Sequence, residues 1–150
     1  MIPTRDSFLT EYPDHFYLDR EAPEALEAHL RGSGYLSEDE RLTQCELAGE
    51  GNMNCTLRVR TTHRTFIVKQ ARPWVEKYPQ FEAPWERILR EAEFYKRVVE
   101  APAAAAMMPR LLACDGKHHL LMLEDLGSGG DYRSVYHGEP WENEILEALA

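Results

Sequence analysis

The chain has 150 residues, of which 43% are hydrophobic. A single domain of this size can bury about two-thirds of the surface that its unfolded chain exposes. The 26 acidic and 17 basic residues give a net charge of -9, which excludes a general nucleic-acid binder because such proteins present a basic face. The sequence has neither an apolar run long enough to span a membrane nor a signal-peptide core, so we expect a cytoplasmic protein without a membrane partner.

Residues 1–40 are predicted to form a helical extension. Aromatic residues scattered among charges over 1–21 indicate a short helix or a packing arm. The stretch 23–30 begins with proline, continues with strong helix formers and is followed by Gly32, which predicts a helix. Its apolar side comprises Ala22, Leu26 and Leu30.

Residues 41–126 are predicted to form an antiparallel sheet with a flanking helix. Apolar and polar residues alternate over 55–60, and 65–70 is a second strand-like run after a short turn, which predicts a hairpin. Residues 71–84 contain three prolines and are expected to be irregular. Residues 85–99 have a helical period. The apolar face of that helix comprises Ile88, Leu89, Ala92, Tyr95 and Val99.

The next segment predicts a further hairpin. An alanine-rich run over 101–108 is bracketed by prolines, so we expect a loop with at most one helical turn. Two apolar runs, 110–114 and 118–124, flank Asp115-Gly116, a dipeptide that favours a tight hairpin. The predicted fold class is therefore α+β, with an antiparallel sheet of about five strands, one flanking helix and extra N-terminal helices.

A glycine turn carries the first candidate chemistry. Gly49-Glu50-Gly51-Asn52-Met53-Asn54 lies between strand-like runs. Adjacent glycines let a backbone approach a phosphate closely and supply N–H donors, and an asparagine tolerates left-handed backbone. In a dinucleotide-binding unit this spacing opens a helix, whereas here a strand follows, as in kinases. The alternative is an ordinary hairpin whose glycines serve only the turn.

Lys69 ends the apolar run Phe66-Ile67-Val68. Strand alternation places Ile67 and Lys69 on one face, where a lysine is costly unless it is paired. The following helix carries three glutamates, of which Glu91 is the best placed to reach inward. The alternative is that Lys69 lies on an edge strand and points into water, and that the glutamates lie on the solvent-exposed side of the helix.

The run 120–126 turns from apolar to polar. It is interpreted either as a connector whose backbone reads an adenine edge, with Met122 lining the back of the pocket, or as a buried strand followed by a loop. Adjacent histidines at 118 and 119 point to opposite faces of a strand and have no evident third ligand, so we expect no metal site. The three cysteines are expected to be reduced, and the alternative is a cross-strand disulfide between Cys45 and Cys55.

Taken in order, these motifs resemble the N-terminal lobe of the aminoglycoside phosphotransferase-like kinases. The similarity covers residues 40–127, including Arg90-Glu91-Ala92-Glu93-Phe94-Tyr95 and Leu123-Glu124-Asp125-Leu126. Within that group, Gly51-Asn52-Met53-Asn54 and Val68-Lys69-Gln70-Ala71 look most like the methylthioribose kinase branch.

The resemblance implies an enzyme that uses ATP and Mg²⁺ to phosphorylate a hydroxyl group of a small molecule. It implies that the glycine turn covers the phosphates, that Lys69 contacts the α- and β-phosphates and is oriented by Glu91, and that residues 124–126 hold adenine. The complete set of nucleotide-binding residues expected is Gly49, Gly51, Asn52, Asn54, Ile67, Lys69, Glu91, Met122, Glu124 and Leu126.

The family's His-x-Asp catalytic loop and its magnesium-binding aspartate have no match here, since Asp125 and Asp131 lie at the wrong places. We therefore expect an amino-terminal lobe, inactive alone, in which residues 127–150 form a hinge and a first helix over 141–149. The acceptor and magnesium sites would belong to a second lobe, and the exposed apolar face of the fragment would favour self-association. The rival hypotheses are a non-catalytic acidic interaction module and a regulatory kinase-derived lobe.

Overall fold

The computed structural model describes residues 2–49 and 51–127, and these form an α+β fold built on one antiparallel sheet. The strand order is β1-β2-β3-β7-β6. The strands are β1 (Leu42–Leu47), β2 (Cys55–Thr61), β3 (Thr65–Gln70), β6 (Leu111–Asp115) and β7 (Leu120–Glu124). The first three strands form a meander, and β7 then pairs with β3, which makes β3 the central strand. The predicted α+β class with about five antiparallel strands is confirmed.

One face of the sheet packs against the N-terminal extension. Phe66 and Val68 of β3 point into this core, together with the buried apolar residues of β2. Helix α2 (Pro23–Gly32) begins at a proline and covers this face with Leu26 and Leu30, both fully buried. The predicted helix is confirmed, as are Leu26 and Leu30 on its apolar side. The helix continues to Gly32 because the left-handed residue that ends it is Gly34.

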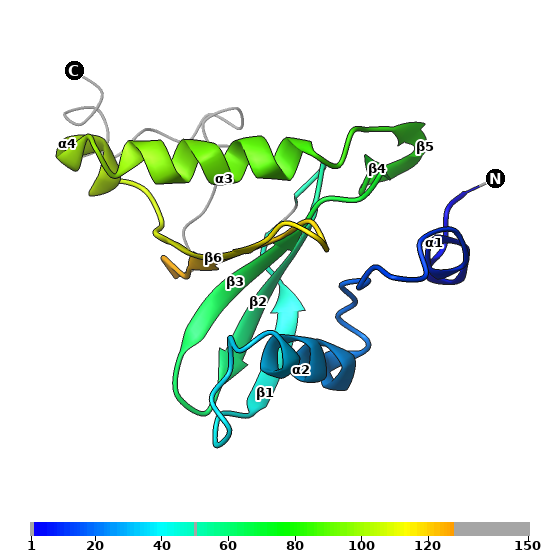
Figure 1. Ribbon diagram of the computed structural model, residues 1–150, viewed down its shortest axis with the longest axis horizontal. Helices are drawn as coiled ribbons and strands as arrows, with labels where there is room; N and C mark the ends of the chain where they lie inside the picture. The colour runs from blue at the N-terminus through cyan, green and yellow to red at the C-terminus, as the bar shows by residue number, and fades with distance from the viewer. Residues whose placement is uncertain (1, 50, 128–150) are drawn as a thin grey trace, which may run out of the picture.

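The opposite face packs against helix α3 (Arg87–Val98). Its buried residues Ile88, Ala92 and Tyr95 contact Leu121 and Leu123 of β7. Figure 1 shows α3 and α2 on opposite sides of the sheet, so the sheet forms the middle layer of a three-layer arrangement. None of the described helices is long and apolar enough to cross a lipid bilayer.

The segment 71–84 differs from the sequence expectation. It forms a small two-stranded ribbon, β4 (Trp74–Val75) and β5 (Tyr78–Glu82), rather than an irregular loop. Pro79 fits in β5 because a two-stranded ribbon consists only of edge strands, where a missing N–H is tolerated. Val99 lies just beyond the end of α3 and is 69% exposed, so its predicted place on the apolar face is wrong.

Two short helices complete the described chain. Helix α1 (Arg5–Glu11) starts at Thr4, whose side chain accepts a hydrogen bond from the Ser7 amide in a capping box. Helix α4 (Pro102–Ala105) is the single helical turn allowed by the flanking prolines. The predicted hinge beyond Gly127 and the predicted helix over 141–149 lie outside the described residues.

Candidate functional site

Helix α3 covers only part of its sheet face and leaves a hollow beside the glycine loop, of which residues 48–49 and 51–54 are described. The hollow has a volume of about 420 Å³. Its walls are formed by Ala48, Gly49, Thr56, Arg58, Ile67, Pro109, Leu123, Glu124, Asp125, Leu126 and Gly127. Four residues predicted from the sequence therefore meet at one place: Gly49, Ile67, Glu124 and Leu126. Strand pairing brings them together, because Ile67 of β3 lies opposite Leu123 of β7.

Lys69 and Glu91 form an ion pair next to this hollow. The lysine Nζ lies 2.6 Å from Glu91 Oε1 and 2.9 Å from Oε2. Lys69 pairs across the sheet with Thr56, which lines the hollow. Both charged side chains keep about a quarter of their surface exposed, 24% and 26%, so the pair is not sealed inside the core. The pairing predicted from strand alternation and the helix period is confirmed.

The backbone of the glycine loop is held at both ends. Gly49 has a φ of +76°, which an L side chain rarely adopts. The Ala48 amide donates to Thr56 O at 3.0 Å, which closes the loop at its base. At the tip, the Lys77 amide of the β4–β5 turn donates to Asn52 O, also at 3.0 Å. The loop therefore docks on the small ribbon that the sequence did not predict.

Asn54 does not face the hollow. It is buried, with 9% of its surface exposed, and its Oδ1 accepts a hydrogen bond of 3.1 Å from Nε of Arg87 at the start of α3. A Cβ on Gly51 would lie 3.3 Å from the Asn54 carbonyl oxygen, a tight contact within the loop's own backbone. Gly51, Asn52 and Asn54 thus shape the loop, whereas Gly49 lines the hollow.

Met122 lies on the other side of the sheet from Lys69. It pairs with Val68, is 3% exposed and belongs to the core beneath α2. The expectation that it lines the back of the pocket is therefore wrong, and Leu123 occupies that wall instead. The physical reason is the two-residue period of a strand: a shift of one residue moves a side chain to the opposite face.

The connector after β7 is fixed by two arginines. Arg58 on β2 donates to Asp125 at 2.9 and 3.0 Å and to the Gly127 carbonyl at 2.7 Å. Burial raises the pKa of Asp125, but hydrogen bonds from Arg58 and the Gly127 amide outweigh it and hold the pKa below its usual value. Arg110 pairs with Glu124, and this hydrogen bond lowers the pKa of Glu124. Sequence reasoning missed both arginines, although Arg58 shares the face of Ile67 by alternation.

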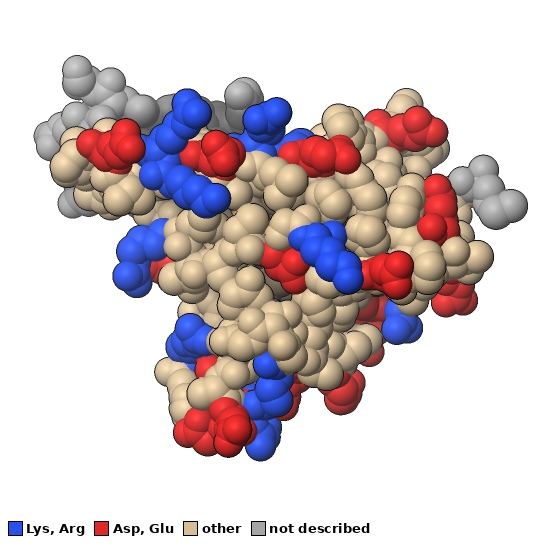
Figure 2. Space-filling model, viewed as in Figure 1, with Lys and Arg blue, Asp and Glu red and all other residues tan. Residues whose placement is uncertain are grey.

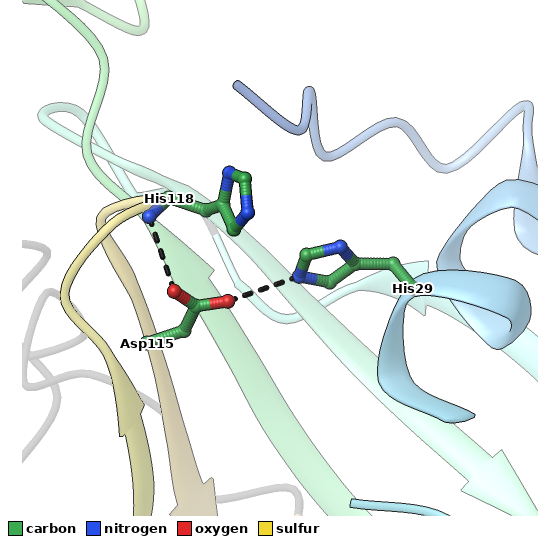
Figure 3. Close-up of side chains that lie close together, drawn as sticks. All are labelled: His29, Asp115 and His118. Carbon is green, nitrogen blue, oxygen red and sulfur yellow. Dashed lines mark hydrogen bonds and ion pairs between the residues drawn. The ribbon is translucent and has the colours of Figure 1, made fainter. Parts of the chain in front are cut away.

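A second polar group lies at the far end of β6. Among residues 2–49 and 51–127, His29, Asp115 and His118 bring possible ligand atoms within 4.8 Å of one another (Figure 3). His29 Nε2 lies 3.1 Å from Asp115 Oδ2, and the His118 amide donates to Asp115 Oδ1. The Phe16 amide donates to His118 Nδ1 at 3.0 Å, which occupies the lone pair that a metal would need. We therefore interpret the group as a hydrogen-bonded clasp that fastens the N-terminal extension to the β6–β7 turn.

The surface charge is mixed. On the face shown in Figure 2, basic and acidic side chains are interspersed over α3 and the sheet edge, without an extended basic surface. The cysteines of the described chain are free. Cys45 pairs with Val59 and Cys55 with Gln70, so the two thiols lie at different levels of the hairpin and the alternative Cys45–Cys55 disulfide does not form.

Comparison with known proteins adds no family. No model of a known protein family matches the chain, and no curated protein matches it.

Proposed function

We propose that the chain is the ATP-binding lobe of a phosphotransferase that phosphorylates a hydroxyl group of a small molecule. The fold gives the required order of parts: a glycine loop between β1 and β2, a lysine on β3, a glutamate on the next long helix and a connector after β7. This order is the one in which the sequence resembles the aminoglycoside phosphotransferase-like kinases.

The single observation that carries the proposal is the ion pair between Lys69 and Glu91. A lysine held at a fixed point by a helical carboxylate is the device with which kinases place a positive charge against the α- and β-phosphates. Gly49 of the glycine loop lines the same hollow, and the backbone N–H groups of such a loop are the donors that bind phosphate oxygens.

The hollow itself fits the base of the nucleotide. Ile67 and Leu123 supply apolar walls, and residues 124–127 of the connector also line the hollow. Such a combination of apolar surface and a few fixed polar groups is typical of small-molecule sites. The expected contacts are therefore adenine against the connector and phosphates toward Lys69.

The described residues do not fit a magnesium site. Of the residues that line the hollow, Glu124 and Asp125 are the carboxylates, and arginines hold both. Magnesium prefers one or two carboxylates together with phosphate oxygens and water. We therefore assign no magnesium ligand and no acceptor-binding residue to residues 2–49 and 51–127.

The proposal is tested by nucleotide binding to the chain and to two lysine variants. Lys69→Met removes a charge-assisted hydrogen bond worth about 1.5–3 kcal/mol, so calorimetry with Mg-ATP should show roughly ten- to hundredfold weaker binding. Lys96→Met, on the exposed side of α3, is the matched control and should bind as the parent does. Binding of ATP that is equal in parent and Lys69→Met, or absent from both folded proteins, would contradict the proposal and favour a non-catalytic interaction module.

A further inference from the structure

Arg87 makes an unusual set of contacts at the first turn of α3. Its Nε donates to Asn54 Oδ1 at 3.1 Å, and its Nη2 donates to the Met53 carbonyl at 2.7 Å. Its Nη1 donates to the carbonyls of Arg72 and Pro84 at 2.9 and 2.8 Å. Nη2 also donates to the Trp74 carbonyl of β4 at 3.3 Å. One guanidinium group thus joins the glycine loop, the segment between β3 and β4, the β4–β5 ribbon and the start of α3.

These acceptors are all neutral. No carboxylate lies among the hydrogen-bond partners of Arg87 within the described chain. Burial lowers the pKa of Arg87 from its usual value, while the charges of Glu76, Glu86 and Glu91 act in the opposite direction without a hydrogen bond to it. A planar guanidinium can serve several carbonyls in fixed directions, whereas a lysine ammonium cannot. Geometry rather than charge neutralisation therefore defines the role of this side chain.

We propose that Arg87 is a positioning residue that sets the conformation of the glycine loop, with Asn54 as its anchor within the loop. The inference rests on the proposed function and deepens it. Asn54, expected from the sequence to cover phosphates, acts instead through Arg87, and the loop amides contact the phosphates. The loop is consequently set before nucleotide arrives rather than folding over it.

The same helix carries the glutamate of the site. Arg87 and Glu91 are four residues apart, one turn of α3, and therefore lie on the same side of the helix. Through Arg87 the helix fixes the glycine loop, and through Glu91 it fixes Lys69. Both phosphate-binding parts thus take their position from α3, and a shift of this helix would displace them together.

The first test does not require nucleotide. Hydrogen exchange is measured in the parent chain, Arg87→Met, Arg87→Lys and the control Arg90→Met, whose arginine lies exposed on the next turn. The amides of Glu76 and Lys77 report on the loop, because they donate to the Met53 and Asn52 carbonyls. We expect these two amides to exchange about tenfold faster in both Arg87 variants, since each variant loses hydrogen bonds of the guanidinium group to the loop, while β2 and β3 stay protected. Unchanged exchange of the Glu76 and Lys77 amides in Arg87→Met would overturn the inference. If Arg87→Met lowers protection everywhere, Asn54→Leu serves in its place, because it removes only the loop acceptor.

The second test separates this inference from the proposed function. If the parent binds Mg-ATP, Arg87→Met should weaken ATP binding about tenfold and leave adenosine binding unchanged, because only phosphates reach the loop. Equal loss of ATP and adenosine binding would mean that Arg87 merely supports the fold, and would overturn the positioning role. If the parent binds neither ligand, the proposed function fails, while the exchange experiment still decides whether Arg87 holds the loop.

Discussion

Arg58 and Asp125 form a bidentate pair, with Nε to Oδ2 at 2.9 Å and Nη2 to Oδ1 at 3.0 Å, across 67 residues of sequence. The pair ties β2 to the connector that follows β7. The Asp125 carboxylate also accepts from the Gly127 amide, and Arg58 donates to the Gly127 carbonyl, so the turn with a φ of +88° at Gly127 is held from both sides. This relationship defines one wall of the hollow.

Arg58→Lys should weaken Mg-ATP binding about tenfold, because a lysine keeps the charge but loses the two-pronged geometry that fixes the connector. Calorimetry gives the affinity directly. Arg60→Lys, two residues along the same strand and exposed, is the matched control and should bind normally. If Arg58→Lys and Arg60→Lys bind alike, the pair does not position the adenine contacts.

Glu91→Gln should reduce Mg-ATP affinity by less than Lys69→Met does. The glutamine keeps the size of the side chain and one hydrogen bond to the lysine but removes the charge that fixes the ammonium group, a loss of about 1–2 kcal/mol or roughly five- to thirtyfold in affinity. Glu93→Gln, exposed on the same helix, is the control. If Glu93→Gln changes the ATP affinity as much as Glu91→Gln does, the effect comes from the overall charge of the helix and not from the ion pair with Lys69.

Gln70→Leu should lower the free energy of unfolding by at least about 2 kcal/mol, since it strips partners from buried backbone groups. Gln70 is 1% exposed, accepts from the Leu18 amide at 2.8 Å and donates to the Phe16 and His118 carbonyls at 2.7 and 3.0 Å. Urea denaturation measures the change. Gln44→Leu, at an exposed position of β1, should change stability by less than about 0.5 kcal/mol; equal effects would show that Gln70 does not anchor the extension.

Stability should fall as the pH drops below about 6.5, the usual pKa of histidine. Burial lowers the pKa of His118, so the folded state binds its proton less readily than the unfolded state does. The neutral His118 ring contributes to the free energy of unfolding at pH values above the pKa that this group has in the unfolded state. This contribution is lost as the pH falls through the lower pKa of the folded state. Protonation also removes the acceptor that Nδ1 offers to the Phe16 amide.

Denaturation curves at pH 7.5 and 5.5 test this dependence. In His118→Asn the loss between the two pH values should be smaller than in the parent. Asp115 raises the pKa of His118, whereas His29, Lys117 and His15 lower it, and all four remain in this variant. His63→Asn, at an exposed turn, is the control. If His63→Asn reduces the pH dependence of stability and His118→Asn does not, His118 is not the group responsible.

Cys55 should resist alkylation at pH 8. Burial raises the pKa of its thiol to about 12, so the reactive thiolate is scarce, and only 6% of the residue is exposed. Cys45 and Cys114 are half-buried and should react faster with iodoacetamide, as followed by mass spectrometry of peptides. In urea the three thiols should react alike. Rapid labelling of Cys55 in the folded protein would mean that β2 opens readily.

Local patterns of the sequence determined the elements and the main charged pair. Alternation over β3 placed Phe66 and Val68 in one core and Lys69 on the other face, and the helix period singled out Glu91. These inferences succeed because side-chain direction in a strand or helix depends on the backbone period alone. The same rule would have placed Met122 correctly if the register of β7 against β3 had been known.

Tertiary structure alone decided how distant polar groups pair. Arg87 reaches Asn54 from another element, and His29 reaches Asp115 across 86 residues. The β4–β5 ribbon docks against the glycine loop through backbone hydrogen bonds, and no local sequence pattern predicts that contact. Each buried donor or acceptor must form a hydrogen bond with a group that lies close to it in space. Which groups lie close is determined by the packing of the whole chain, so no local pattern predicts these partners.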